Sequence, residues 1–306
     1  MRLLSDDMSC TPPSAPDLAE LEIAVQAALA AGDHASLSIV GFGEVSVALG
    51  WPLQAPSWVC KRTPPMNRLQ FDQYRGLVFD YVDRLRAGGV DVIDTTIHTI
   101  ERRNDVVAYL VQPMRPADQI GHRVLAAATP DPEHPFLSAI IAALGVVDDR
   151  ISIDAQVTNF AWDGETATLL DVGTPFMWAG DGSQLFDLTP FEAMLPAPAR
   201  PSMRKELVEL IARWKDPRAV GVDIVANLMR EGLDEWVEPM IMALNRSIAT
   251  GQPIERADAE AVWADDRKTF PLITRLKKVQ RTWMTTVRRR PYEFFVNSTY
   301  GGSSLA

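Results

Sequence analysis

The sequence predicts an α+β fold in which a small antiparallel β-sheet lobe precedes a larger helical lobe. Short apolar segments of strand-like composition concentrate between residues 37 and 113, and helical spacings of apolar residues dominate from residue 114 onward. Strands followed by a run of helices are typical of this class. With 306 residues, 47% of them hydrophobic and 23% charged, the chain is long enough to bury an extensive core. We therefore expect three parts: an N-terminal extension with one helix (1–36), a β-rich lobe (37–113) and a helical lobe that ends in a basic amphipathic helix (114–306).

The composition excludes several classes of protein. No apolar run approaches the ~20 residues of a membrane span, and the N-terminus lacks the apolar core of a secretory signal. Two cysteines, Cys10 and Cys60, imply no disulfide framework, and the four histidines have no metal-ligand spacing. These features favour a cytoplasmic protein. The formal net charge of −10 argues against a nucleic-acid partner and mildly favours a cationic substrate.

A single helix is expected before the first strand. Residues 1–16 are rich in Pro and Ser and predict little regular structure. Apolar residues then recur at helical spacing between Leu18 and Leu29. Asp17 is the expected N-cap of this helix, and Gly32 is its expected end. The helix is predicted to pack on the first lobe.

The next segment, Leu37–Leu49, predicts a strand, a glycine turn and a second strand. Gly41 and Gly43 would permit the positive φ and the close backbone approach that a phosphate-covering turn needs. Ser46 takes the place of the third glycine of G-x-G-x-x-G, and a plain hairpin is the alternative interpretation. A Rossmann dinucleotide site is disfavoured because a strand, not a helix, follows the turn.

The rest of the β-rich lobe contains one strand, one helix and two further strands. Trp58–Lys61 predicts a strand that ends in lysine, and Leu69–Ala87 predicts an amphipathic helix. Val90–Thr99 and Val106–Val111 predict two antiparallel strands joined by a polar turn. Acidic residues on the predicted helix are Asp72, Asp80 and Asp83.

The stretch 151–176 carries the densest set of candidate functional residues. Asp154 is followed five residues later by Asn159, then by a turn at 162–164 and a β-like run that ends in Asp171-Val172-Gly173. Hard oxygen ligands grouped in this way suit Mg²⁺, which proteins usually hold with one or two carboxylates and substrate phosphates. A polar hairpin with an Asp at each end is the alternative interpretation.

This D-x-x-x-x-N segment, followed by a hydrophobic strand and D-x-G, resembles the catalytic and metal-binding segments of the protein-kinase-like fold. The aminoglycoside and choline phosphotransferase branch is the nearer match. The resemblance covers residues 37–195 and implies a bilobal architecture with ATP and Mg²⁺ as cofactors. It implies that Asp154 is the catalytic base for a substrate hydroxyl, and that Asn159 and Asp171 are the metal ligands.

The same resemblance implies a nucleotide site in the first lobe. Lys61 would grip the α- and β-phosphates, and Asp72, early in its helix, would pair with that lysine. The hinge between the lobes would fall at Val111–Met114, where backbone groups meet adenine. The implied nucleotide-binding residues are Gly41, Gly43, Lys61, Asp72, Gln112 and Met114.

Several positions depart from the kinase-like pattern. Ser152 stands where the family has a His or its equivalent, the third turn glycine is missing, and the helix offers Asp instead of Glu to the lysine. No A-P-E stretch follows Gly173. The lack of a protein-substrate segment favours a small-molecule acceptor.

The chain after residue 176 predicts mostly helices and ends in a basic segment. Residues 267–290 carry many Lys and Arg but no acid, together with an apolar stripe at helical spacing. Such a helix can bind an anionic membrane surface or a protein partner, or it can pack its stripe on the acidic body of the protein. Candidate helices before it are 185–194, 202–214, 218–231, 235–249 and 258–267.

Two functional hypotheses are consistent with these features. The first is an ATP- and Mg²⁺-dependent phosphotransferase that acts on a hydroxyl of a small molecule, with a cationic acceptor favoured by the acidic body. The second is a catalytically silent kinase-like protein that works through nucleotide or partner binding. Retention of Asp154, Asn159 and Asp171 together argues for the first hypothesis.

Overall fold

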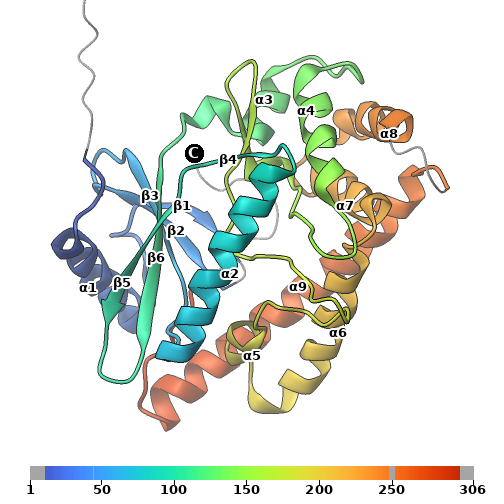
Figure 1. Cartoon of the computed structure of the whole chain (residues 1–306). Coiled ribbons are helices and arrows are strands. Elements are labelled where there is room, and N and C mark those ends of the chain that lie inside the picture. The colour runs from blue at the N-terminus through green and yellow to red at the C-terminus, as the bar shows by residue number, and fades with distance from the viewer. Residues whose placement is uncertain (1–10, 44, 248–251, 297–306) are drawn as a thin grey trace, which may run out of the picture.

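The computed structural model describes residues 11–43, 45–247 and 252–296, and the predicted α+β class is confirmed. A five-stranded antiparallel sheet with the strand order β1-β2-β3-β6-β5 forms one part, and helices form most of the remainder (Figure 1). The expected lysine strand and the strand before the hinge are adjacent, with Lys61 opposite Leu110. The strands of this sheet are β1 (Ile39–Phe42), β2 (Val47–Trp51), β3 (Trp58–Arg62), β5 (Thr96–Glu101) and β6 (Val106–Pro113).

A second, three-stranded sheet has the order β4-β8-β7. Its strands are β4 (Asp91–Val92), β7 (Phe160–Trp162) and β8 (Ala167–Leu169). The prediction of one strand over 90–99 was therefore wrong, because 91–92 pair in parallel with β8 and the chain joins the five-stranded sheet only at Thr96. The strand period of two residues does not reveal which partner a strand selects.

The helices follow the predicted order with several changes of boundary. The last two predicted helices form one continuous helix, α9, which contains Pro271, and a π-helical turn (Trp283–Val287) follows it. The helix predicted at 185–194 is only five residues long, and the helix expected to start at Ser202 begins at Arg200. Within the described residues, no helix is both long and apolar enough to cross a bilayer. The helices are α1 (Ala15–Ala31), α2 (Arg68–Ala87), α3 (Gly121–Ala127), α4 (Pro135–Ala143), α5 (Thr189–Ala193), α6 (Arg200–Arg213), α7 (Pro217–Arg230), α8 (Val237–Ser247) and α9 (Arg256–Thr282).

The start of α1 corrects the predicted cap. Ser14, not Asp17, is the N-cap, and the two side chains form a capping box in which Asp17 accepts a hydrogen bond from the Ser14 backbone N–H. The predicted end is confirmed, because Gly32 adopts a left-handed conformation with φ 73°. Residues 1–10, including Cys10, lie outside the described residues. They belong to the region 1–16 that was predicted to have little regular structure.

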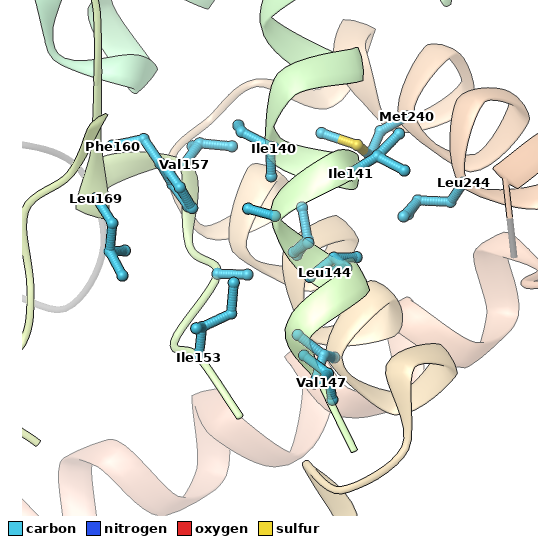
Figure 2. Close-up of a cluster of buried hydrophobic side chains, with 14 of the residues drawn as sticks. Ile140, Ile141, Leu144, Val147, Ile153, Val157, Phe160, Leu169, Met240 and Leu244 are labelled. Carbon is cyan, nitrogen blue, oxygen red and sulfur yellow. The ribbon is translucent and has the colours of Figure 1, made fainter. Parts of the chain in front are cut away.

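The largest hydrophobic core supports the segments that carry the candidate site residues. Ile153, Val157, Phe160 and Leu169 are all buried and pack with the apolar faces of α4 and α8 (Figure 2). These residues alternate with the polar candidates in sequence, so burial of one set fixes the position of the other. Full burial of each such side chain contributes about 1.5–3 kcal/mol.

A buried ionic cluster joins two distant segments to the five-stranded sheet. Arg62 of β3 donates hydrogen bonds to Glu22 of α1 (2.8 and 2.9 Å) and to Glu293 near the C-terminus (2.7 Å). Arg102 and the Tyr109 hydroxyl also donate to Glu22. These partners outweigh the effect of burial and lower the pKa of Glu22 to about 2. The cluster therefore fixes α1 and the C-terminal segment beside the strand that carries Lys61.

Candidate functional site

The β7–β8 hairpin brings Asn159 and Asp171 to its open end. Phe160 pairs with Leu169, and the backbone N–H of Leu170 donates to the Asn159 carbonyl at 2.7 Å. The opposite end closes in the predicted turn, where the Asp163 carboxylate accepts two backbone N–H groups and Gly164 has φ 104°. Strand pairing therefore places a side-chain amide just before β7 and a carboxylate just after β8, at the same end of the hairpin.

Asn159 also connects this hairpin to Asp154. Its Nδ2 donates to the Asp154 carbonyl oxygen at 3.1 Å, which closes the loop between the two residues. The Asp154 carboxyl itself is half-buried. Burial, followed by the nearby negative charge of Asp171, raises the pKa of Asp154 from 3.8 to about 6. The loop thus holds a carboxyl group that titrates close to neutral pH.

Three residues that sequence reasoning missed support this carboxyl group. Gln156 Nε2 donates to Asp154 Oδ2 at 3.1 Å, and Gln156 Oε1 accepts from Arg230 Nη2 (2.9 Å) and Asn227 Nδ2 (3.2 Å). Because Asn227 and Arg230 of α7 both donate to the amide oxygen of Gln156, the amide NH₂ group must point toward Asp154. These bonds therefore fix the orientation of the amide. Their spacing of three residues on one helix was the available signal, because i and i+3 share a face.

Lys61 reaches the same hairpin from the five-stranded sheet. Its Nζ donates to Asp171 Oδ1 at 3.2 Å and to the Leu170 carbonyl at 2.9 Å. Burial pushes the pKa of Asp171 upward, but Lys61 and the backbone N–H of Gly173 outweigh that effect, and the pKa lies below its ordinary value. Three sequence-predicted residues, Lys61, Asn159 and Asp171, are therefore brought together with Asp154.

Asp72 does not pair with Lys61, contrary to the expectation. Its carboxylate lies 3.7 Å from Arg75 on the same helix and is half exposed. The Asp side chain is shorter than the Glu of the kinase-like pattern, and Lys61 forms its ion pair with Asp171 instead. Both Lys61 and Asp72 instead line one cavity of about 510 Å³ beside α2.

This cavity lies between α2, β3 and the segment after Asp171. Its lining includes Tyr74, Leu77, Leu110, Gly173 and Phe186, and most of its lining is apolar. The Tyr74 hydroxyl donates to the Gly173 carbonyl at 2.9 Å, which ties α2 to the D-x-G segment. Neither Asp154 nor Asn159 lines the cavity. The cavity therefore adjoins the candidate site only on the side of α2.

The hinge candidates are engaged in the protein's own hydrogen bonds. The buried Gln112 side chain donates to Thr95 Oγ1 and to the Leu170 carbonyl, both at 3.0 Å. The backbone N–H of Met114 donates to the Ser57 carbonyl at 2.9 Å. Gln112 therefore links the end of β6 to the hairpin that carries Asp171.

The glycine turn is present, but its glycines do not have the expected conformation. Neither Gly41 nor Gly43 has a positive φ. Gly41 lies within β1, and the Gly43 N–H donates to the Ser46 carbonyl at 3.0 Å. A Cβ at position 43 would lie 2.8 Å from Ser46 Oγ, a contact that rotation of the serine side chain would relieve.

The donor set fits a magnesium ion held partly by phosphate. Asp171 Oδ1 is occupied by Lys61 and by the Gly173 N–H, whereas within the described part of the chain Oδ2 has no hydrogen bond. Asn159 uses its NH₂ group within the protein, which leaves Oδ1 available. No group of three or more His, Cys, Asp or Glu side chains gathers into a metal site among the described residues. Two oxygen ligands match the few protein ligands that Mg²⁺ usually has beside phosphate and water.

Comparisons with known proteins give a family match but no activity. The model of a family of unknown function (DUF6206) matches residues 20–281. A search of curated proteins found no match. Among solved structures, a crystal structure of WbdD matches with 12% identity and a TM-score of 0.30, covering 72% of this chain and 48% of that chain. The chain thus spans about half the length of WbdD, and a TM-score this low does not establish a shared fold.

Proposed function

The chain belongs to DUF6206, a family of unknown function, and from the geometry of its own site we propose that it is a kinase-like phosphotransferase that uses ATP and Mg²⁺. The acceptor would be a hydroxyl group of a small molecule. One observation carries the proposal: a strand lysine, Lys61, pairs with Asp171 at the open end of the hairpin that also positions Asn159 against the loop of Asp154.

The nucleotide end of the site would use Lys61, Asn159 and Asp171. Lys61 is largely buried and would place a fixed positive charge next to the phosphates. Asn159 Oδ1 and Asp171 Oδ2 would hold Mg²⁺, which when bound neutralises charge on the β- and γ-phosphates. The hydrogen bond from Lys61 and the Gly173 N–H hold the Asp171 carboxylate in place before any ligand arrives.

Asp154 would orient the acceptor hydroxyl and accept its proton. A general base works best when its pKa lies near the working pH, and the pKa of about 6 at Asp154 meets this condition better than the ordinary 3.8. Gln156 would keep one carboxyl oxygen engaged, so that the other faces the acceptor. In-line positioning and electrostatics would supply most of the rate enhancement.

The segment after D-x-G favours a small-molecule acceptor. Phe176, Trp178, Phe186 and Leu188 are buried and pack in one cluster with the C-terminal Tyr292. A segment that docks a polypeptide substrate would need to expose such residues. A cationic acceptor is the preferred class, because the protein has a net charge of −10 and the half-buried Asp223 lies near enough for its negative charge to raise the pKa of Asp154.

A catalytically silent kinase-like protein is the second candidate. Two observations favour it. Lys61 Nζ already donates to the Leu170 carbonyl and to Asp171, and Asp72 pairs with Arg75 and not with Lys61 as the kinase-like pattern requires. Nucleotide binding without transfer to any acceptor would fit this candidate. The retained base, with its raised pKa, argues against it.

The experiment is a calorimetric titration of ATP with and without Mg²⁺. We expect wild-type binding to require the metal, and we expect Asp171→Asn to lose at least tenfold in affinity because a charged ligand to the metal is removed. Asp72→Asn is the matched control, since this carboxylate lines the adjacent cavity but does not pair with Lys61. Equal loss in both variants, or no ATP binding by the wild type, would contradict the proposal.

The role of the base needs a separate measurement. Asp154→Asn should keep metal-dependent ATP binding within about threefold and lose phosphoryl transfer by a factor of about 10² or more. The transfer assay would screen hydroxylated amines as acceptors. A parallel loss of nucleotide binding would contradict the assignment of Asp154 as the base.

A further inference from the structure

The C-terminal part of α9 and the π-helical turn after it carry a stripe of exposed apolar side chains. Leu272 is 56% exposed, Val279 58%, Trp283 51% and Val287 57%. We name these four residues the apolar stripe. The sequence had left open whether this side of the helix packs on the body of the protein. Leu276, next to the stripe, packs on a core cluster, whereas these four residues remain exposed.

The stripe is a continuous line along one side of the helix. Because each residue of an α-helix turns by about 100°, Leu272, Val279 and Trp283 lie within about 40° of one another around the axis. The π-helical turn, in which the Arg288 N–H donates to the Trp283 carbonyl, advances by less per residue and keeps Val287 near the same line. At about 1.5 Å per residue the stripe is about 22 Å long.

The neighbouring face of α9 fixes the orientation of the stripe. Ile273, Leu276 and Met284 pack against a core cluster that includes Met203 and Ile211 of α6. Figure 1 shows α9 running through the helical part to its red end at the lower left of the view. The body of the protein therefore holds the helix while the stripe remains exposed.

Cations border the stripe on its other side and at its end. Segment 267–290 contains no acid, and the N-terminal part of α9 forms ion pairs through Arg256, Asp258 and Asp266. The exposed cations in this segment are Arg267, Lys268, Arg275, Lys278, Arg288, Arg289 and Arg290. Of these, Lys268 and Arg275 lie within about 60° of the stripe.

We propose that this face docks on the surface of an anionic lipid bilayer. An apolar line that contains Trp suits the boundary between headgroups and acyl chains, where amphipathic helices lie parallel to the surface. Long Lys and Arg side chains next to such a line reach the headgroups while their stems stay with the apolar residues. The positive charge of the segment complements anionic lipid and contrasts with the net charge of −10 of the whole protein. The proposal is independent of the phosphotransferase activity.

The test is flotation of the full chain with two kinds of vesicle, phosphatidylcholine alone and phosphatidylcholine mixed with phosphatidylglycerol. We expect binding to the mixed vesicles only, with release at high salt because the attraction is screened. Val279→Ser combined with Trp283→Ser should reduce the partition coefficient at least tenfold. Lys268→Gln combined with Arg275→Gln should do the same, since each cation contributes about fivefold.

Two control variants distinguish binding through this surface from nonspecific adsorption to vesicles. Ile23→Ser removes an apolar side chain of α1 that is more exposed than the stripe residues, and Lys205→Gln removes an exposed cation from α6. Both should bind mixed vesicles as the wild type does. The stripe residues are exposed, so thermal unfolding of their variants should match that of the wild type.

Several results would overturn the proposal. They are no binding to mixed vesicles, equal binding to both kinds of vesicle, and undiminished binding by the stripe and cation variants. A dimer in solution that the stripe variant converts to monomer, measured by sedimentation velocity, would also overturn it, because a second copy would then cover the stripe.

Discussion

Replacing Asp154 by Asn should make the protein more stable at neutral pH. The folded protein holds this carboxyl group in a half-buried position near Asp171, which raises its pKa from 3.8 to about 6. Between these two pH values the folded state retains a proton that the unfolded chain has released. Stability contributed by the protonated group is therefore present below about pH 4 and is lost as the pH rises through about 6.

The magnitude depends on the size of the shift. Roughly two pKa units at about 1.4 kcal/mol each give an upper limit of about 3 kcal/mol. Asp154 is partly exposed, so solvent screening reduces this value, and we expect Asp154→Asn to gain about 1–2 kcal/mol at about pH 7.5. The amide is isosteric with the carboxyl group and can still accept the hydrogen bond from Gln156.

The assay is urea unfolding of both proteins across roughly pH 4.5–8. The difference in unfolding free energy should grow as the pH rises toward about 7 and then stay constant. Asp163→Asn is the matched control, because hydrogen bonds from the backbone N–H groups of Thr166 and Glu165 lower the pKa of that exposed carboxylate. Its effect on stability should have the opposite sign.

A stability difference that does not vary with pH would refute this reasoning. So would a destabilised Asp154→Asn protein at neutral pH. Either result would mean that the environment of Asp154 does not disfavour the carboxylate, and the argument for a general base near neutral pH would fail with it.

Two further substitutions test the packing around the site. Glu22→Gln should destabilise the protein by up to about 3 kcal/mol, because the buried Arg62 would lose one of its two charged partners and keep only Glu293. In the wild type this contribution should be lost as the pH falls from 4.5 toward about 2, so acid unfolding of the variant should show a weaker pH dependence. Gly121→Ala should cost about 1–3 kcal/mol, because its Cβ would lie 2.1 Å from the Val157 carbonyl oxygen in the loop that follows Asp154. Gly76→Ala, where a Cβ meets nothing within 4 Å, should instead be neutral or stabilising, and urea unfolding of the glycine pair compares them directly.

Features that depend on near neighbours in the chain could be predicted from the sequence. The turn at Asp163-Gly164 and the β-like runs beside it form one hairpin, so Asn159 and Asp171 had to meet at its open end. Lys61 at the end of a strand and the helix after it were equally local. Hydrogen bonds and side-chain periodicity within a few residues encode such elements.

The partners of these residues depend on the packing of distant segments. Lys61 and Asp171 are 110 positions apart, and contact between the five-stranded sheet and the hairpin of the three-stranded sheet brings them within 3.2 Å. The bonds of Gln156 to α7 and the exposure of the stripe on α9 likewise depend on how whole elements pack. Packing minimises exposed apolar area summed over the entire chain, so no local window of sequence contains the answer. The sequence by itself determines the chemistry of each side chain, whereas the tertiary structure determines its partner and its access to solvent or lipid.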